Sequence, residues 1–451
     1  MTALTTILTP TGMLGYGYPE ADFWECIERG VDAIVVDSGS TDPGPYLLGR
    51  GELLVDESAY LRDLTPMVAA AARHHIPLIV SSAGGAGIAA QVDRIAELIV
   101  DIAERDGHRL TMARMYSDID PEVVIQRLDN GDVAANVRGE VPTRADVESC
   151  TNIVAQIGAE PFAKVLAEGV DVIVAGRAYD PAPHAAWGIA KDVDPGIAWH
   201  AGKILECGGA CCEPKGSGVL ATLERDAFVL TPMSPGARCT PLSVAAHTLY
   251  EKARPDLLPG PDGVLDLTGC TYTAVDERTV RVTGSRHRPQ PPTLKLEGAA
   301  VVGHRAVFIG GVRDPILIAG IDAFLDTLRG HLSALYPQLG DGTAQLHFHI
   351  YGRNAVMGER EPINATAHEV GILGEITAPT PELAKAIASM ARIGVLHLPY
   401  PGQVATAGNL ALPLNPMENS IGPVCAFRLY HVMGADGLQP TRTRIEQIGT
   451  P

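Results

Sequence analysis

Apolar residues in the first 180 positions follow two different spacings. Short runs rich in β-branched residues are typical of buried strands, and they are Ala33–Asp37, Pro77–Ser81, Leu110–Arg114 and Asp171–Ala175. Between them apolar residues recur at three- and four-residue intervals, which predicts amphipathic helices at Ala59–His75, Ala89–Asp106, Pro121–Asn130 and Val147–Glu168. Apolar strands that alternate with helices predict an open, mostly parallel sheet with helices on both faces.

The pattern changes from about Val219 onward. A β-rich segment follows, with a strand–turn–strand pattern in Val264–Arg288, further strands at Pro292–Leu296 and Ala306–Gly310, and then a helix at Asp322–Tyr336. The last part predicts strand, strand, helix and strand, at Ala344–Tyr351, Val370–Thr377, Pro381–Ile393 and Gly422–His431. This order indicates a small α+β sandwich of ferredoxin-like type.

Length and charge narrow the class of protein. A chain of 451 residues is too long for one ordinary core and predicts two or three domains. With 46% hydrophobic and 20% charged residues, the composition is that of a globular protein. The net charge of −18 and the lack of a basic stripe argue against nucleic-acid binding, so an anionic substrate would need its own local pocket.

Targeting signals and cysteine usage indicate a cytoplasmic protein. No apolar run reaches the roughly 18 residues of a membrane helix, and the acidic N-terminal segment lacks the basic start of a secretory signal. The eight cysteines are mostly scattered, which favours reduced thiols. A homo-oligomer is expected on general grounds.

The run Lys203–Cys212 (KILECGGACC) is the richest in chemistry. Lys203 lies three and four residues before Glu206 and Cys207, so all three can share one helix face. A nearby lysine lowers the pKa of a thiol, and Glu206 is then a candidate general acid or base. The alternative is a Lys–Glu pair on the surface beside a packed cysteine.

Polar residues follow the first predicted strand, where ligands of parallel sheets bind. They are Asp37, Ser38, Gly39, Ser40 and Asp42. Such residues can hold polar substrate groups, or Mg²⁺ through the carboxylates. The alternative is a turn in which Ser40 or Asp42 caps the next helix.

Two further strand ends carry candidates for anion binding. In Ser81–Gly87, Gly84 and Gly85 allow backbone N–H groups to approach an anion. The spacing differs from GxGxxG, which argues against NAD(P). Arg177 and Asp180 follow the fourth strand, and an arginine there suits bidentate recognition of a carboxylate or phosphate. The alternative is an Arg–Asp pair that stabilises the loop.

Metal binding is the less favoured interpretation of two other groups. Cys207, Cys211 and Cys212 could form one corner of a metal site, but adjacent cysteines rarely share one zinc and no second CxxC lies nearby. His347 and His349 lie on one face of a predicted strand, which could equally face another domain. The favoured expectation is therefore no metal ligand and no cofactor, with a divalent metal as the alternative.

Several stretches resemble the acyclic terpene utilisation (AtuA-like) family. They are Lys203–Gly209 (KILECGG), Thr271–Arg286 (TYTAVDERTVRVTGSR), Leu294–Pro315, Val395–Tyr400, Thr406–Asn409 and Gly422–Val432. The resemblance implies an α/β domain over residues 1–340 and a ferredoxin-fold domain over 341–451. It also implies chemistry on branched acids and acyl-CoA compounds. Cys211-Cys212 and the loop Asp37–Gly44 depart from the usual family sequence.

Together these features predict a lyase or isomerase of hydratase or dehydratase type, acting on a small branched or hydroxylated carboxylic acid or its CoA thioester. Glu206 would act as acid/base with Lys203 or Cys207 assisting, and Arg177 and the glycine-loop N–H groups would hold the developing negative charge. One alternative is a metal-dependent lyase using His347 and His349. Another is a non-catalytic subunit of an acyl-CoA-metabolising complex.

Overall fold

The computed structural model describes residues 3–39, 44–136, 139–249, 254–363, 365–404 and 408–449. Ser40 and Asp42 lie outside the described residues. The chain forms two compact units, unit 1 (Met1–Ala300 with Phe427–Pro451) and unit 2 (Val301–Ala426). The expected boundary at 340/341 lies inside unit 2, because the segment after Ala300 pairs with a strand of that unit.

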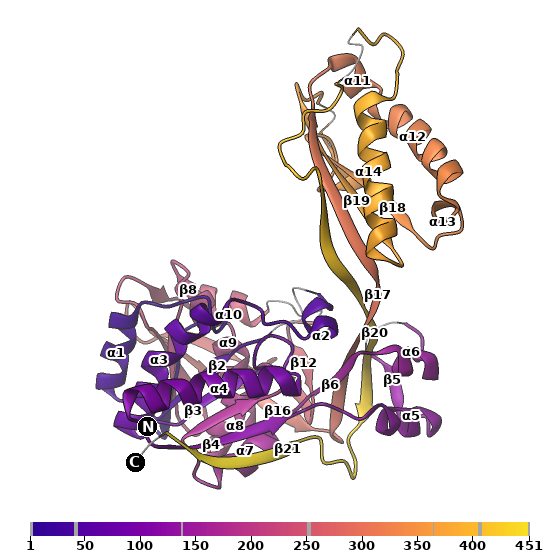
Figure 1. Cartoon of the computed structure of the whole chain (residues 1–451). Coiled ribbons are helices and arrows are strands. Elements are labelled where there is room, and N and C mark those ends of the chain that lie inside the picture. The colour runs from indigo at the N-terminus through magenta and orange to yellow at the C-terminus, as the bar shows by residue number, and fades with distance from the viewer. Residues whose placement is uncertain are drawn as a thin grey trace. The chain divides into compact units, whose positions relative to one another are not determined.

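Unit 1 is built on a ten-stranded mixed sheet (Figure 1). Its parallel strands, in sheet order, are β1 (Thr5–Thr9), β2 (Ala33–Asp37), β3 (Leu78–Ser81), β7 (Val172–Ala175) and β4 (Leu110–Tyr116). Antiparallel strands extend both edges: β9 (Val219–Leu223), β10 (Ala227–Pro232), β15 (Val280–Thr283) and β14 (Thr271–Ala274) beyond β1, and β21 (Arg442–Ile448) beyond β4. The expectation of a mostly parallel sheet is therefore wrong in this respect, because the pairs β9–β10 and β14–β15 extend one edge with antiparallel strands and β21 does so at the other.

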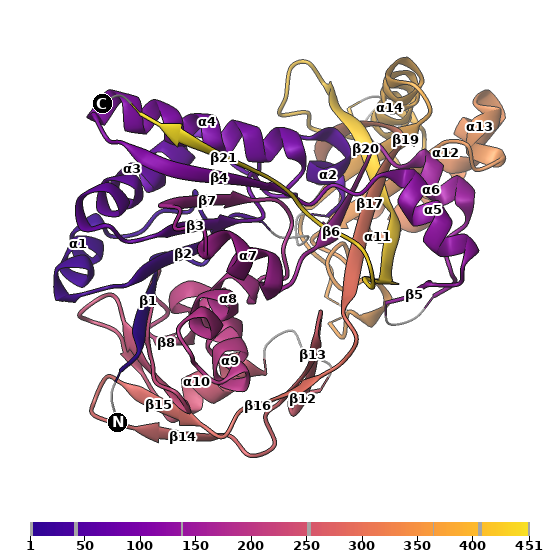
Figure 2. The same cartoon turned by 90° about the horizontal axis from the view of Figure 1, so that it is seen from below.

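Helices cover both faces of this sheet, as predicted (Figure 2). Ile34 and Val80 face one core with α1 (Glu20–Arg29), α3 (Glu57–His74) and α4 (Ala89–Asp106). Val35 and Ile79 face the other core with α7 (Ala159–Leu166), α8 (Ala182–Ala190) and α9 (Pro195–Leu205). Neighbouring residues of a strand point to opposite faces, so a strand buried on both faces is apolar throughout.

The helix expected at Val147–Glu168 is wrong. That segment contains the end of α6 (Arg144–Ser149), then β6 (Asn152–Gln156), then α7. The sequence Asn152–Gln156 (NIVAQ) pairs antiparallel with Lys295–Ala299, which lie far along the chain. A short apolar run fits a strand or a buried helix equally well, and here the distant partner decides.

The rest of unit 1 forms small layers beside the large sheet. Its helices and strands are α2 (Tyr46–Arg50), α5 (Pro121–Asp129), β5 (Val133–Ala135), the 3-10 turn η1 (Gly208–Cys211), β8 (Cys212–Glu213), β11 (Arg238–Cys239), α10 (Pro241–Thr248), β12 (Leu257–Gly260), β13 (Gly263–Asp266) and β16 (Arg286–Pro289). The strand–turn–strand expected within Val264–Arg288 is present as the antiparallel pair β14 and β15, and the same segment also contains β13 and β16, which belong to a separate sheet.

Unit 2 contains strands of a second sheet and the helices that pack with them. Its elements in chain order are β17 (Thr293–Val312), α11 (Pro315–Ala319), α12 (Ile321–Leu335), α13 (Pro337–Gly340), β18 (Gln345–Tyr351), the 3-10 turn η2 (Gly358–Arg360), β19 (Val370–Ala378), α14 (Pro381–His397) and β20 (Glu418–Gly434). These strands belong to a six-stranded sheet of order β18-β19-β17-β20-β5, in which β6 also pairs with β17, and β17 and β20 each carry residues of both units. Figure 1 shows α12 and α14 side by side, and their apolar residues share one core with Phe308 and Ile372. The two strands expected at Pro292–Leu296 and Ala306–Gly310 are one continuous strand, β17.

In the described part of the chain, no helix has the length and apolar character that crossing a bilayer requires.

Candidate functional site

The loops that follow β2, β3 and β7 meet at the carboxyl ends of these neighbouring parallel strands. The backbone N–H of Ser38 donates to the Ser81 carbonyl at 2.9 Å, and that of Ser82 donates to the Gly176 carbonyl at 3.0 Å. Gly84 donates its N–H to the Ser38 hydroxyl at 3.3 Å. Candidate residues from three separate parts of the sequence therefore lie together, as expected for adjacent strand ends.

Glycine is required where two of these loops touch. Gly87 has a φ of +70°, and a Cβ atom built on it would lie 2.2 Å from the Arg177 backbone nitrogen. Gly85, one of the expected anion-binding glycines, has a φ of +117° and packs against Leu47 and Leu54. These glycines bring backbone segments into close contact, which is a structural reason for their presence.

Arg177 is a buried cation held by two carboxylates, the buried Glu297 and the partly exposed Asp180. The Arg177 side chain is 3% exposed. Its Nε donates to Glu297 Oε2 at 3.0 Å, and Nη1 donates to Asp180 Oδ1 at 2.9 Å and to the Ser82 hydroxyl at 3.0 Å. Gln156 and Lys295 bind the other Glu297 oxygen at 2.8 and 3.3 Å. The alternative of an Arg–Asp pair within the loop is thus present, and Glu297 extends it.

Sequence reasoning missed Glu297. This carboxylate is buried in β17. Burial raises the pKa of Glu297, but the charges of Arg177 and Lys295 lower it by a larger amount, so the net shift is downward. The signal was a charged residue within the apolar run Leu294–Ala300. A buried acid in a strand needs a cationic partner, and only the fold identifies Arg177 as that partner.

Asp37 is a buried carboxyl group whose pKa is shifted upward, opposite to that of Glu297. Its Oδ1 accepts hydrogen bonds from the Ser38 N–H and the Ser81 hydroxyl, each at 3.0 Å. Burial raises the pKa of Asp37 well above its usual range, Asp180 and Glu206 add to the rise, and Arg177 opposes it. The electrostatic coupling of Asp37 to Glu206 connects the strand ends with α9.

Lys203 and Glu206 form an ion pair at the end of α9, and the pair is buried rather than on the surface. The exposed fractions of the two side chains are 3% and 6%. Asp194 caps the start of α9 by accepting the Gly196 N–H at 2.8 Å, and Pro195 occupies its first turn. Cys207 follows, partly buried, with its carbonyl packed against Gly12. Lysine and glutamate side chains are rarely buried unless they are paired, and burying both charges is costly in desolvation.

A small cavity of about 20 Å³ lies beside Lys203. Its polar lining includes Tyr179, Asp262 and His287, and Trp199 closes one side. His287 Nε2 lies 3.3 Å from Asp262 Oδ1, and its ring stacks on Trp199. Burial raises the pKa of Tyr179, and Glu206, Asp180 and Asp262 raise it further, so this hydroxyl stays protonated.

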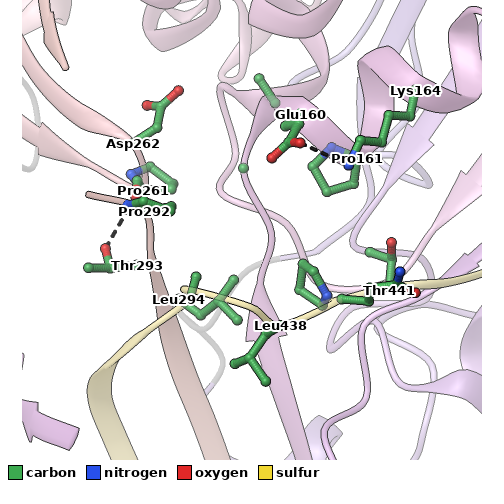
Figure 3. Close-up of a pocket in the computed structure, with 15 residues that line it drawn as sticks. Glu160, Pro161, Lys164, Pro261, Asp262, Pro292, Thr293, Leu294, Leu438 and Thr441 are labelled. Carbon is green, nitrogen blue, oxygen red and sulfur yellow. Dashed lines mark hydrogen bonds and ion pairs between the residues drawn. The ribbon is translucent and has the colours of Figure 1, made fainter. Parts of the chain in front are cut away.

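A larger pocket of about 330 Å³ also has Asp262 in its lining (Figure 3). Apolar side chains line part of it, including Pro292, Leu294 and Leu438, and Lys164 lies on the opposite side next to Glu160 at 2.8 Å. Asp262 is thus common to the larger pocket and to the small cavity beside Lys203. Sequence reasoning missed Tyr179, Asp262 and His287, because their wide separation in the chain gave no pattern.

Residues 56–408 match the model of the family described as "Acyclic terpene utilisation family protein AtuA". This protein belongs to the AtuA family. The matched segment contains the Lys203–Glu206 pair, Arg177 and Glu297, whereas Asp37 precedes it. No curated protein and no solved structure matches the chain.

The histidine pair of this AtuA family protein lies in unit 2. His347 and His349 are in β18, and His349 Nε2 lies 2.9 Å from Glu375 Oε2. Arg305 binds the other oxygen of Glu375 at 2.7 Å. A carboxylate already paired with a guanidinium is a poor metal ligand, so this arrangement favours an ion-pair network over a metal site.

The cysteine cluster differs from the one considered for the sequence. Within the described ranges, the His, Cys, Asp or Glu side chains close enough to share an ion are those of Cys211, Cys212 and Cys239. Cys207, the expected third member, is not in this group. Cys239 joins because β11 pairs with β8, which the sequence spacing did not indicate.

Proposed function

We propose that this AtuA family protein is a metabolic enzyme that moves protons on a small branched or hydroxylated carboxylic acid or its CoA thioester, as a hydratase- or dehydratase-type lyase or an isomerase. The observation that carries this proposal is the buried Lys203–Glu206 pair beside the cavity lined by Tyr179, Asp262 and His287. The family description, acyclic terpene utilisation, supports a branched aliphatic substrate.

In the dehydration direction, Glu206 accepts the proton from the carbon next to the carbonyl group. The C–H electron pair forms the new double bond, and the C–O bond of the hydroxyl group breaks. Lys203 donates a proton to the departing hydroxyl, which leaves as water, and hydration is the reverse. Tyr179 donates a hydrogen bond to the oxygen on which negative charge develops. An isomerase would use the same proton transfer and return the proton at another carbon.

The larger pocket supplies a binding surface for such a substrate. Leu294 and Leu438 offer apolar contact for a branched chain, and Lys164 offers a cation for a carboxylate or a CoA phosphate. Because the cavity beside Lys203 has room for about one water molecule, the reacting group must displace Asp262 or His287 from their present positions.

We assign the strand-end cluster a positioning role. Arg177 is engaged by Glu297 and Asp180, so its charge holds the loops and tunes Asp37. Ser38, Gly39, Gly84 and Gly85 lie in the same loops and are candidates for contacting substrate oxygens through backbone N–H groups.

We also propose that unit 2 is a ferredoxin-like domain. The chain order strand, helix, strand, strand, helix, strand with the sheet order β18-β19-β17-β20 supports this assignment. The proposed chemistry places no residue of this unit in the site.

The test is exchange of the α-proton with solvent deuterium. Paired free acids and CoA thioesters are incubated with the enzyme in D₂O, and deuterium incorporation is measured by mass spectrometry. We expect exchange with one class, its loss by at least about 100-fold in Glu206→Gln, and retention of the thermal shift caused by the same compound. Glu213→Gln, a partly exposed glutamate of the same unit, is the matched control.

Unchanged exchange in Glu206→Gln would contradict the assignment of the base. A wild-type protein that is stabilised by none of the paired compounds and exchanges none of them would favour the non-catalytic subunit.

A further inference from the structure

Three buried thiols meet in unit 1 outside the proposed site. The sulfur atoms of Cys211, Cys212 and Cys239 all lie within 4.8 Å of one another, and those of Cys212 and Cys239 are 3.7 Å apart. All three residues are buried within the core that also contains Val244 and Ala237. The proposed proton transfer uses none of them.

The fold brings these thiols together through a short strand pair. Cys211 ends η1 and Cys212 begins β8, which pairs antiparallel with β11 so that Cys239 lies directly opposite Cys212. The next register pair, Glu213 and Arg238, forms an exposed ion pair at 3.4 Å. Because neighbouring residues alternate sides, the charged pair faces solvent and the cysteine pair faces the core.

The separations match those of sulfur ligands around one ion. With metal–sulfur bonds of about 2.3 Å, three sulfurs in a plane around a metal lie roughly 4 Å apart. No fourth His, Cys, Asp or Glu side chain joins the group among the residues that the structure describes. Zinc prefers four ligands in a tetrahedron, and the burial of the cluster disfavours a water molecule as the fourth.

We propose that Cys211, Cys212 and Cys239 form a three-thiolate site for one soft monovalent metal ion, of which Cu(I) is the biological representative. Soft thiolate ligands select Cu(I), zinc or iron–sulfur clusters, and of these zinc and the clusters require four ligands, which leaves Cu(I) for a site of three. The ion would bind the segment that follows α9 to β11, and so would fix the chain next to Lys203 and Glu206.

Arg278 is in direct contact with the strand pair that carries the cluster, because the Cys239 backbone N–H donates to the Arg278 carbonyl at 2.9 Å. Arg278 is held beside the strand pair by its bonds to the Ala237 and Ser234 carbonyls, at 3.0 and 2.8 Å. A bound ion would displace the protons of the three thiols, so binding should release protons and strengthen as pH rises.

The test uses the full-length protein, reduced and without oxygen, titrated with Cu(I) against a chromogenic Cu(I) chelator. We expect one tightly held equivalent, a near-ultraviolet thiolate-to-metal absorption band and a raised melting temperature. Cys211→Ser, Cys212→Ser and Cys239→Ser should each weaken binding by about 100-fold or more. Cys26→Ser, a buried cysteine of α1, is the matched control and should bind as the wild type does.

Three outcomes would overturn the proposal. The first is a reduced wild-type protein that retains no Cu(I), a result that needs no variant to fold. The second is retention that is unchanged in Cys239→Ser. The third is a parallel Zn(II) titration in which zinc is held in preference to Cu(I), since this would require a four-coordinate site.

Discussion

The ion pairs of unit 1 and unit 2 consist of similar side chains in different surroundings. Lys203 and Glu206 in unit 1 are nearly inaccessible to solvent. In unit 2, the exposed fractions of His349 and Glu375 are 37% and 22%, and Arg305 is also partly exposed. Both groups show short contacts, so contact distance alone does not distinguish them.

The comparison shows that burial determines how much an ion pair changes the free energy of unfolding. Solvent screens the pair in unit 2, and exposed pairs of this kind contribute about 0–1 kcal/mol. In unit 1 both charges are removed from water, which costs several kcal/mol per ion and ties each charge to its partner. A pair of charges that is expensive to bury is a reason to expect function there.

Removing the cation of the buried pair should have the largest effect. Lys203→Met leaves the buried Glu206 carboxylate without the lysine ammonium, and we expect the free energy of unfolding to fall by about 3–5 kcal/mol. The double variant Lys203→Met/Glu206→Met should recover most of this loss. Urea unfolding measures both values, and a double variant no more stable than the single one would show that the pair is not the origin.

A glycine substitution tests how tightly the strand-end loops pack. Gly87→Ala places a Cβ atom against the Arg177 backbone, whereas Gly358→Ala in unit 2 has a similar positive φ with no atom within 4 Å. We expect Gly87→Ala to lower the free energy of unfolding by about 1–3 kcal/mol more than Gly358→Ala does. Equal losses measured by urea unfolding would mean that only the backbone conformation matters.

A pH series tests a buried neutral histidine of unit 1. Burial lowers the pKa of His200 to about 3, and its ring nitrogens lie 2.7 Å from the Ser285 hydroxyl and 3.1 Å from that of Thr248. The unfolded chain binds this proton near pH 6.5, so the stability due to neutral His200 is complete above that pH and is lost as the pH falls toward 3.

At pH 5.5 this loss amounts to about 1.4 kcal/mol for one histidine. His200→Gln should therefore show a shallower fall in unfolding free energy between pH 6.5 and pH 3 than the wild type. Burial also lowers the pKa of His184 to about 3, so His184→Gln should have the same effect. A variant that carries both substitutions should lose both contributions to the slope of unfolding free energy against pH. Superimposable pH profiles for the wild type and His200→Gln would contradict the neutral buried ring.

The smallest effect is expected on the exposed sheet face of unit 2. Glu375→Gln removes the carboxylate shared by His349 and Arg305. We expect a change in unfolding free energy below about 1 kcal/mol, reduced further by added salt because solvent ions screen the pair. A loss comparable to that of Lys203→Met would remove the distinction between the two regions.

Strong local patterns allowed good prediction of single elements. The helix expected at Ala89–Asp106 has those bounds in the structure, and the strand at Ala33–Asp37 does as well. Both have long or uniform apolar patterns. Asn152–Gln156 was mistaken for part of a helix, because its strand partner is Lys295–Ala299 and no local signal reports a partner so far away.

The sequence by itself determined the family, the helices that cover both faces of the sheet, and the convergence of the strand-end loops, because apolar periodicity and glycine-bearing strand ends are local properties. Only the tertiary structure decided which charges are buried together. It paired Arg177 with Glu297, placed Asp262 and His287 near Lys203, and brought Cys239 to Cys212. The reason is physical: burial and electrostatic pairing depend on contacts between distant segments, and residue types alone do not specify those contacts.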